Sequence, residues 1–254
     1  MYYMTTKQII HNVDDIQVIE YEKSSIYIIE NILDNEFCDK LRNCIDQLPL
    51  NKLFHSDGNN VECNISYIDE LLKLNDELYY SFTTDTDKYH DQLNKLQQKQ
   101  CFYTNQINGI SKKNIENYKN HIDTTIIKIK NAMVYINKNI KFDCNSGYIL
   151  RKIYGSTCLH IDNINEVYET NLNFIKENNK GEYKMIRNSS IIFGLNDDYD
   201  GGLYNFPYYD ITIRLKKGSV IIFPPYWTHE HQVFGVENNT YRYTISTWNC
   251  MNII

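Results

Sequence analysis

The stretch Tyr241-Arg242-Tyr243-Thr244-Ile245-Ser246-Thr247-Trp248 lies near the end of the 254-residue chain, and its composition predicts a β-strand. Side chains of a strand alternate between two faces, so residues two apart share a face. One face would carry Arg242, Thr244, Ser246 and Trp248. The other face would carry Tyr243, Ile245 and Thr247. An arginine with two hydroxyl groups beside it suits a bound carboxylate, because the guanidinium is a rigid fork of donors.

The rest of the chain beyond Asn145 has the same β character. Eight of the ten glycines and three of the four prolines lie there, between short apolar runs. Many short strands separated by turn residues are typical of a sandwich or barrel. The runs are residues 147–153, 189–195, 211–215, 219–223, 231–236 and 241–248.

Two helices are predicted before Asn145. Residues 35–48 have apolar side chains at intervals of three and four, with Asp34 as an N-cap and Pro49 as the stop. Residues 111–138 carry one continuous apolar stripe, which is the strongest helical signal in the chain.

The remaining N-terminal segments are less regular. Residues 16–30 are rich in β-branched and aromatic side chains and predict a strand or hairpin. Residues 51–64 are polar and predict a loop, and a further helix is expected to begin near Tyr67. The polar stretch 83–105 fits either an exposed helix or an insertion.

We therefore expect an α+β protein with one catalytic domain over residues 1–254. Residues 1–145 would be mainly helical support, and residues 146–254 would form the β-core with the functional site. The two parts are expected to share one core, because no linker rich in Pro, Gly or Ser divides them.

Composition excludes several classes of function. The net charge of −6 argues against a general nucleic-acid or membrane-surface binder. No apolar run approaches the roughly 20 residues that span a bilayer, and the N-terminal residues lack the order of a signal peptide. Seven cysteines without C-x-x-C spacing predict reduced thiols and a cytoplasmic protein.

A metal site is predicted at His160-Ile161-Asp162. On an extended strand His160 and Asp162 share a face. With a third histidine they would form the two-histidine, one-carboxylate triad of non-haem Fe(II) oxygenases. Two candidates for that ligand, His229 and His231, lie in the C-terminal β-region.

The same pattern occurs once more, at His121-Ile122-Asp123. This copy lies inside the predicted helix 111–138, where residues two apart point away from each other. We expect these two side chains to face solvent and to bind no metal.

Four motifs follow one another in the C-terminal half of the chain. They are His160-x-Asp162; Leu195-Asn196-Asp197-Asp198-Tyr199-Asp200-Gly201-Gly202 leading to Phe206-Pro207; Lys217-Gly218-Ser219-Val220-Ile221-Ile222-Phe223-Pro224; and His231-x-Val233-x-Gly235-Val236 before Arg242-Tyr243-x-Ile245-Ser246-x-Trp248. In this order they resemble the prolyl 4-hydroxylase-like branch of the 2-oxoglutarate- and Fe(II)-dependent oxygenases, and the helix at 35–48 is similar to that family's opening helix.

The resemblance implies a double-stranded β-helix, or jelly roll, that holds Fe(II) by His160, Asp162 and a distal histidine. His231 precedes the arginine at nearly the family's spacing and is preferred over His229. The resemblance further implies that Arg242 pairs with the far carboxylate of 2-oxoglutarate, the co-substrate, with ascorbate as an optional reductant.

The implied reaction uses O2 to hydroxylate a C–H bond and releases succinate and CO2. A prolyl or other residue of a protein or peptide is the first expected substrate. The alternatives are a free amino acid or other small molecule, or a catalytically silent binding module. A nucleic-acid demethylase is not expected, because Trp248-Asn249-Cys250 stands where those relatives carry a second arginine.

The chain departs from the family pattern around the co-substrate. The family places a tyrosine before the H-x-D motif or before the Leu-Asn pair, where this chain has Ile149-Leu150-Arg151 and Gly194. A glycine, Gly235, stands where the family usually has proline. The candidates that would replace the missing contact are Thr244, Ser246 and Tyr148, and Arg151 is a further residue expected within reach of the pocket.

Overall fold

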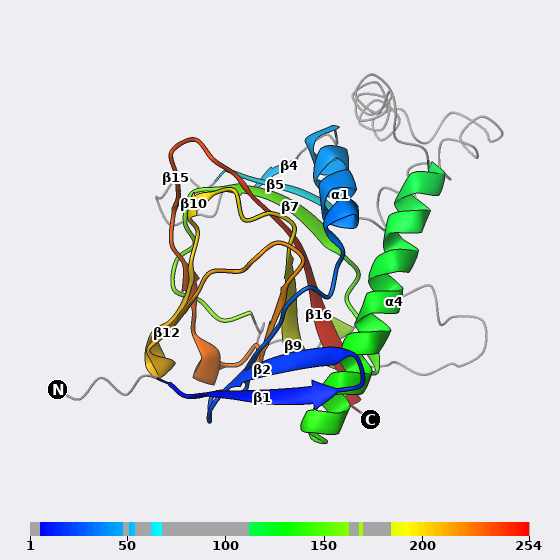
Figure 1. Ribbon diagram of the computed structural model, residues 1–254, viewed down its shortest axis with the longest axis vertical. Coiled ribbons are helices and arrows are strands. Elements are labelled where there is room, and N and C mark those ends of the chain that lie inside the picture. Colours follow the sequence, from blue (N-terminus) through cyan, green and yellow to red (C-terminus); the bar gives the residue numbers. More distant parts are fainter. Residues whose placement is uncertain are drawn as a thin grey trace.

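The computed structural model describes residues 6–47, 51–53, 62–67, 112–162, 168–169 and 184–253. Over these residues it has the predicted α+β jelly-roll class: a large antiparallel sheet, a small antiparallel sheet and two long helices. Figure 1 shows both helices, α1 and α4, on the same side of the β-structure, with β10, β12 and β15 on the opposite side.

The large sheet has β9 and β16 at its centre. Its strand order is β1-β2-β3-β13-β9-β16-β7-β5-β4, with β6 also paired to β16 and β8 to β9. The strands are β1 (Gln8–Val13), β2 (Ile16–Tyr21), β3 (Ile26–Ile29), β4 (Asn51–Leu53), β5 (Glu62–Tyr67), β6 (Cys144–Asn145), β7 (Ile149–Tyr154), β8 (Tyr168–Glu169), β9 (Lys184–Gly194), β13 (Val220–Phe223) and β16 (Arg242–Ile253).

The small sheet closes the other side of the jelly roll. It has the order β12-β11-β14, and a two-stranded ladder of β10 and β15 lies separate from it. These strands are β10 (Asp200–Gly201), β11 (Tyr204–Phe206), β12 (Ile211–Ile213), β14 (Gln232–Val233) and β15 (Val236–Glu237). Two 3₁₀ turns, η2 (Pro207–Tyr209) and η3 (Trp227–His229), follow β11 and β13.

The two helices form where the apolar periodicity predicts them. Helix α1 (Asn35–Gln47) begins after Asp34, whose side chain accepts the backbone N–H of Phe37 at 2.7 Å. This bond satisfies one of the free N–H groups at the helix start, so the predicted N-cap is confirmed. Helix α4 (Lys112–Ile136) buries the predicted stripe at Ile115, Ile122, Ile126, Ile129 and Met133.

Alternation along the central strands divides the apolar side chains between two cores. On β9, Ile191 and Phe193 face the helices, whereas Ile192 faces the interior between the two sheets. The core that contains Ile191 and Phe193 also contains Leu41 of α1 and Ile122 of α4. Among the described residues, the two helices and the C-terminal sheet therefore contribute to one apolar cluster.

Several expectations need correction. Residues 16–30 are strands as predicted, but they also join the main sheet, where β3 pairs with β13. The loop expected over 51–64 is wrong where β4 and β5 form, because strand pairing with β7 outweighs the polar composition. The run 231–236 is divided between β14 and β15. The helix expected from Tyr67 and the stretch 83–105 lie outside the described residues.

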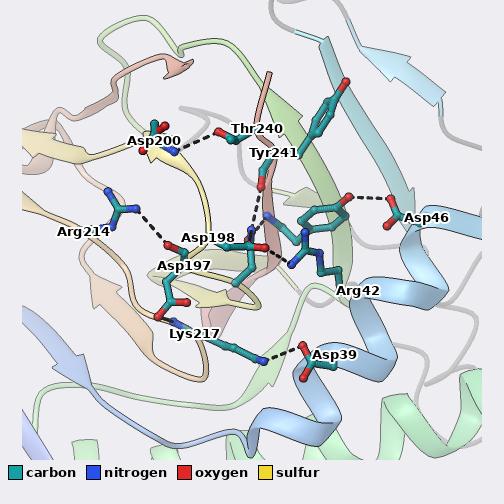
Figure 2. A network of polar contacts seen from close by, with 12 residues as sticks. Asp39, Arg42, Asp46, Asp197, Asp198, Asp200, Arg214, Lys217, Thr240 and Tyr241 are labelled. Carbon is teal, nitrogen blue, oxygen red and sulfur yellow. Dashed lines mark hydrogen bonds and ion pairs between the residues drawn. The ribbon is translucent and has the colours of Figure 1, made fainter. Parts of the chain in front are cut away.

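Ion pairs connect α1 to the loops at one end of the sheet (Figure 2). Arg42 contacts Asp198 at 2.7 Å, and Lys217 contacts Asp39 at 2.7 Å. Exposed pairs of this kind contribute about 0–1 kcal/mol each. The apolar face of α1 is therefore its main anchor. Within the described residues, neither helix has the length and apolar character needed to cross a bilayer.

Close backbone packing between β10 and β15 makes Gly201 sensitive to substitution. Gly201 has φ +68°, and a Cβ there would lie 2.0 Å from the carbonyl oxygen of Gly235. Gly201→Ala should lower the free energy of unfolding by at least about 1–3 kcal/mol, measured by denaturant unfolding. Gly235→Ala is the matched control, since its Cβ would meet no atom within 4 Å. Equal stability of the two variants would contradict this packing.

Candidate active site

His160, Asp162 and His231 converge in the jelly roll. One ligand atom from each lies within 4.8 Å of the others, so the three form a group that can hold a metal ion. The Nε2 atoms of His160 and His231 lie 3.5 and 3.9 Å from the same carboxylate oxygen, Oδ1 of Asp162. The group combines the predicted pair His160 and Asp162 with His231, one of the two histidines considered in the C-terminal β-region.

Backbone pairing brings the two histidines together. His160 and His231 form an antiparallel bridge, in which each N–H donates to the other's carbonyl at 2.9 Å. Their rings are 4.4 Å apart between centroids. Because neighbouring strands lie only about 4.8 Å apart, this pairing places both imidazoles beside each other without any direct side-chain bond between them.

The outer nitrogen of each imidazole faces a backbone carbonyl. Nδ1 of His160 lies 2.8 Å from the oxygen of Cys158, and Nδ1 of His231 lies 3.0 Å from the oxygen of His229. A carbonyl can only accept, so Nδ1 carries the proton in the neutral ring and Nε2 keeps its lone pair. This arrangement is common for histidines that bind metals through Nε2.

Asp162 is held in its charged form. Its Oδ2 accepts a hydrogen bond from Ser190 on β9 at 2.6 Å, which leaves Oδ1 directed at the imidazoles. Burial alone would raise the pKa of Asp162, but the interactions with His160, His231 and Ser190 lower it well below its usual range. Two lone pairs and one anionic oxygen thus meet at one point, and a cation there would relieve their repulsion.

Aromatic side chains enclose the distal histidine. The ring of His231 stacks on Phe206 at 5.5 Å and meets Phe223 edge-on at 4.7 Å between centroids. Burial lowers the pKa of His231, although the nearby Asp162 opposes this effect. The neutral imidazole, which is the form that binds metals, is therefore favoured.

His229 lies apart from this group. It ends the 3₁₀ turn η3, so the strand alternation that would place it beside His231 does not apply. Its Nε2 lies 2.5 Å from the carbonyl oxygen of Ser24, and its Nδ1 lies 2.8 Å from the hydroxyl of Thr228. The geometry thus brings His231, and not His229, to His160 and Asp162.

The predicted row on β16 faces the jelly-roll interior. Arg242, Thr244 and Ser246 are all buried, and Arg242 is only 3% exposed. Among the described residues, Nε of Arg242, Oγ1 of Thr244 and Oγ of Ser246 are buried without a hydrogen-bond partner. Each unsatisfied polar group costs about 1–3 kcal/mol. A ligand that supplied acceptor oxygens would satisfy this row.

Asn196 fixes the backbone on both sides of Arg242. Its Oδ1 accepts the N–H of Tyr243 at 2.7 Å, and its Nδ2 donates to the carbonyl of Tyr241 at 2.8 Å. Asn196 also donates to Asp198, which pairs with Arg42 of α1 in the network of Figure 2. The Leu-Asn pair of the sequence motif therefore positions the arginine strand.

Tyr204 is a site residue that the sequence reasoning missed. Its ring is 2% exposed and lies 4.8 Å from the guanidinium carbon of Arg242. Burial raises its pKa, and the charges of Arg242 and Arg151 oppose the rise. The signal was present in the sequence, because Tyr204 is two residues before Phe206 and alternation places both on one face.

Tyr148 is wrong as a predicted contact to the co-substrate. Its hydroxyl donates to Asp123 of α4, and its ring lies in the core between the sheet and the helices. Tyr148 has the parity of Leu150, which belongs to the same core, whereas Arg151 is in register with Thr244 of the interior row. A one-residue offset therefore puts Tyr148 on the wrong side of the sheet.

The second H-x-D pattern, His121-Ile122-Asp123, lies on helix α4, and its two polar side chains contact different residues. His121 stacks on Phe37 of α1 at 4.1 Å between ring centroids, while Asp123 bonds Tyr148. The expectation that both face solvent is wrong in part, because each side chain is half-buried. Helical geometry directs them to different partners.

Prolyl hydroxylases are among the solved structures that this chain resembles. A viral collagen prolyl hydroxylase from Paramecium bursaria Chlorella virus-1, in a 2OG complex, is 14% identical with a TM-score of 0.51, over 92% of this chain and 98% of that chain. A Trichoplax adhaerens prolyl hydroxylase, in complex with a hypoxia inducible factor oxygen degradation domain peptide fragment, is 12% identical with a TM-score of 0.50, over 89% of this chain and 84% of that chain.

Identities this low show the fold alone, so the chain has a prolyl hydroxylase-like fold. No family model matches the chain, and no curated protein matches its sequence.

Substitution of the two C-terminal histidines should separate metal binding from stability. His231→Ala removes one of three ligand atoms and should weaken Mn(II) binding at least tenfold, measured by isothermal titration calorimetry. His229→Ala should bind Mn(II) as the wild type does. Its free energy of unfolding should be lower by about 1–3 kcal/mol, because the Ser24 carbonyl loses its partner. The reverse pattern of metal affinities would exclude His231 as the ligand.

Proposed function

We propose that the protein is an Fe(II)- and 2-oxoglutarate-dependent dioxygenase that hydroxylates a C–H bond and releases succinate and CO2. The observation that carries this proposal is the His160, Asp162 and His231 group, which faces the same interior as the unsatisfied row of Arg242, Thr244 and Ser246. The prolyl hydroxylase-like fold supports the same reading.

The donor set fits iron. Two imidazole nitrogens and one carboxylate oxygen form the facial triad of non-haem Fe(II) oxygenases, which leaves coordination positions open. When bound there, Fe(II) and 2-oxoglutarate supply the O2 activation and the oxidising power needed to break a C–H bond.

The chain's own groups bind, orient and shield. Ser190 fixes the carboxylate of Asp162, and the carbonyls behind His160 and His231 fix the imidazoles. Arg242 would hold the far carboxylate of 2-oxoglutarate in its fork, with hydroxyls from Thr244 and Ser246 beside it. Arg242, Thr244 and Ser246 are all buried, so water is kept away from the bound carboxylate.

A prolyl or other residue of a protein or peptide is the proposed substrate. Apolar side chains are exposed next to the two bridged histidines: Leu159 precedes His160, and Phe234 lies three residues after His231, with exposed fractions of 47% and 41%. Such side chains suit contact with a peptide. The Trichoplax hydroxylase holds a peptide fragment, which supports this substrate class.

Two other functions would use the same fold. A hydroxylase of a free amino acid or other small molecule would not need the exposed apolar side chains of Leu159 and Phe234. A silent binding module would have no need of the unsatisfied row on β16, whose burial costs stability. That cost favours an active site.

An anaerobic titration with Fe(II) and 2-oxoglutarate tests the function directly. The wild type should develop the weak visible charge-transfer band of the chelate. Arg242→Ala should need roughly 10–100-fold more 2-oxoglutarate, because charge-assisted hydrogen bonds contribute about 1.5–3 kcal/mol. Lys128→Ala, on the exposed side of α4, is the charge control and should titrate as the wild type does.

The absence of a band in folded wild-type protein would exclude the oxygenase and favour the binding module. If the band forms, succinate formation is measured on addition of peptides, together with a mass increase of one oxygen in the peptide. A positive result separates a peptide hydroxylase from a small-molecule hydroxylase.

A further inference from the structure

A second arginine faces the jelly-roll interior from β7. Arg151 is in register with Thr244 of β16, so its side chain lies on the same face as the co-substrate row. Its Nε atom is buried, and no described residue accepts a hydrogen bond from it. A half-buried guanidinium with no carboxylate partner among the described residues is costly, because no such group compensates its lost hydration.

Trp248 supplies another unsatisfied donor next to Arg151. Its Nε1 atom is also buried without a partner among the described residues. The guanidinium carbon of Arg151 lies 6.0 Å from the Trp248 ring centre, and that of Arg187 lies 3.8 Å from it. Guanidinium and indole N–H groups donate and never accept. This donor set therefore selects for a ligand with acceptor oxygens.

The donor set lies at the metal end of the interior. Trp248 is in register with Ser190, which bonds the metal-binding carboxylate of Asp162. Arg242 is six residues earlier on the same strand, a separation of about 20 Å along an extended backbone. Arg151 pairs with Thr244, between these two positions, but its guanidinium carbon lies 6.0 Å from the Trp248 ring centre. The Arg151 head group therefore extends toward Trp248 and the metal end, and Arg242 is left to bind a separate anionic group.

Charge balance leads to the same conclusion. The charges of Fe(II) and Arg242 balance the carboxylate of Asp162 and the two carboxylates of 2-oxoglutarate. The charge of Arg151 is then left without a counter-ion in the described interior. A further anionic group, brought by the molecule to be oxidised, would neutralise it.

We propose that Arg151, with Nε1 of Trp248, binds a carboxylate of the substrate and so makes the enzyme selective for an acidic substrate. The carboxylate is either an acidic side chain next to the oxidised residue or a free main-chain carboxylate. This inference rests on the proposed function, because it assigns the metal and Arg242 to Fe(II) and 2-oxoglutarate.

The test measures binding to protein loaded with Mn(II) and 2-oxoglutarate by isothermal titration calorimetry. The probes are matched prolyl peptides with glutamate or glutamine on either side of the proline, each with a free or an amidated C-terminus. Free L-proline and L-prolinamide complete the set. The wild type should bind at least one carboxylate form tenfold or more tightly than its amide, and the pair that differs identifies the source of the carboxylate.

Three variants show whether Arg151 causes the preference. Arg151→Met should abolish the difference between acid and amide, and Arg151→Lys should restore part of it. Trp248→Phe keeps the ring and removes Nε1, so it should reduce the preference severalfold. Lys128→Met removes an equal charge from the exposed side of α4 and should leave the preference unchanged.

The co-substrate titration separates this inference from the proposed function. In Arg151→Met the Fe(II) and 2-oxoglutarate band should form within about twofold of the wild-type concentration. A requirement raised as far as in Arg242→Ala would assign Arg151 to 2-oxoglutarate and overturn the inference. Wild-type protein that shows the band but binds no acid more tightly than its amide would overturn it as well.

Discussion

The antiparallel pairing of β16 with β9 is the constraint on which the rest of the structure depends. Ten residue pairs join the two strands, and β7 pairs along the other edge of β16. Because side chains alternate, this register sends Tyr243 and Ile245 to the helices and Arg242, Thr244 and Ser246 to the interior. A slip of one residue would bury the arginine against α1 and α4 and remove it from the site.

The same pairing organises the metal end of the site. Ser190 of β9 lies opposite Trp248 of β16 and holds Asp162. Asn196, just beyond the end of β9, brackets Arg242 through the backbones of Tyr241 and Tyr243. The two ends of one strand pair thus hold the proposed metal-binding carboxylate, through Ser190, and the proposed carboxylate-binding row of Arg242, Thr244 and Ser246. The backbone hydrogen bonds of this strand pair set the relative position of Ser190 and Arg242.

The interior combines a well-packed apolar wall with polar groups that lack partners. Phe206 and Phe223 pack around His231, while donors on Arg151, Arg242 and Trp248 are left unsatisfied among the described residues. Local rules of stability are broken here and kept in the helix-facing core. Buried polar groups that lower stability because they lack partners are typical of functional sites. The broken positions all present donors, so anionic ligands are the chemistry they favour.

The sequence by itself determined the β-rich C-terminal half, the two helices, the H-x-D pair and the face that Arg242 shares with Thr244 and Ser246. These features depend on periods of two or of three to four residues, which are local properties of the chain. Only the tertiary structure placed His231, and not His229, beside His160 and Asp162, because a 3₁₀ turn broke the alternation and turned His229 to Ser24. It likewise moved Tyr148 to the helix side and brought Tyr204 beneath Arg242, since those contacts join strands far apart in the chain.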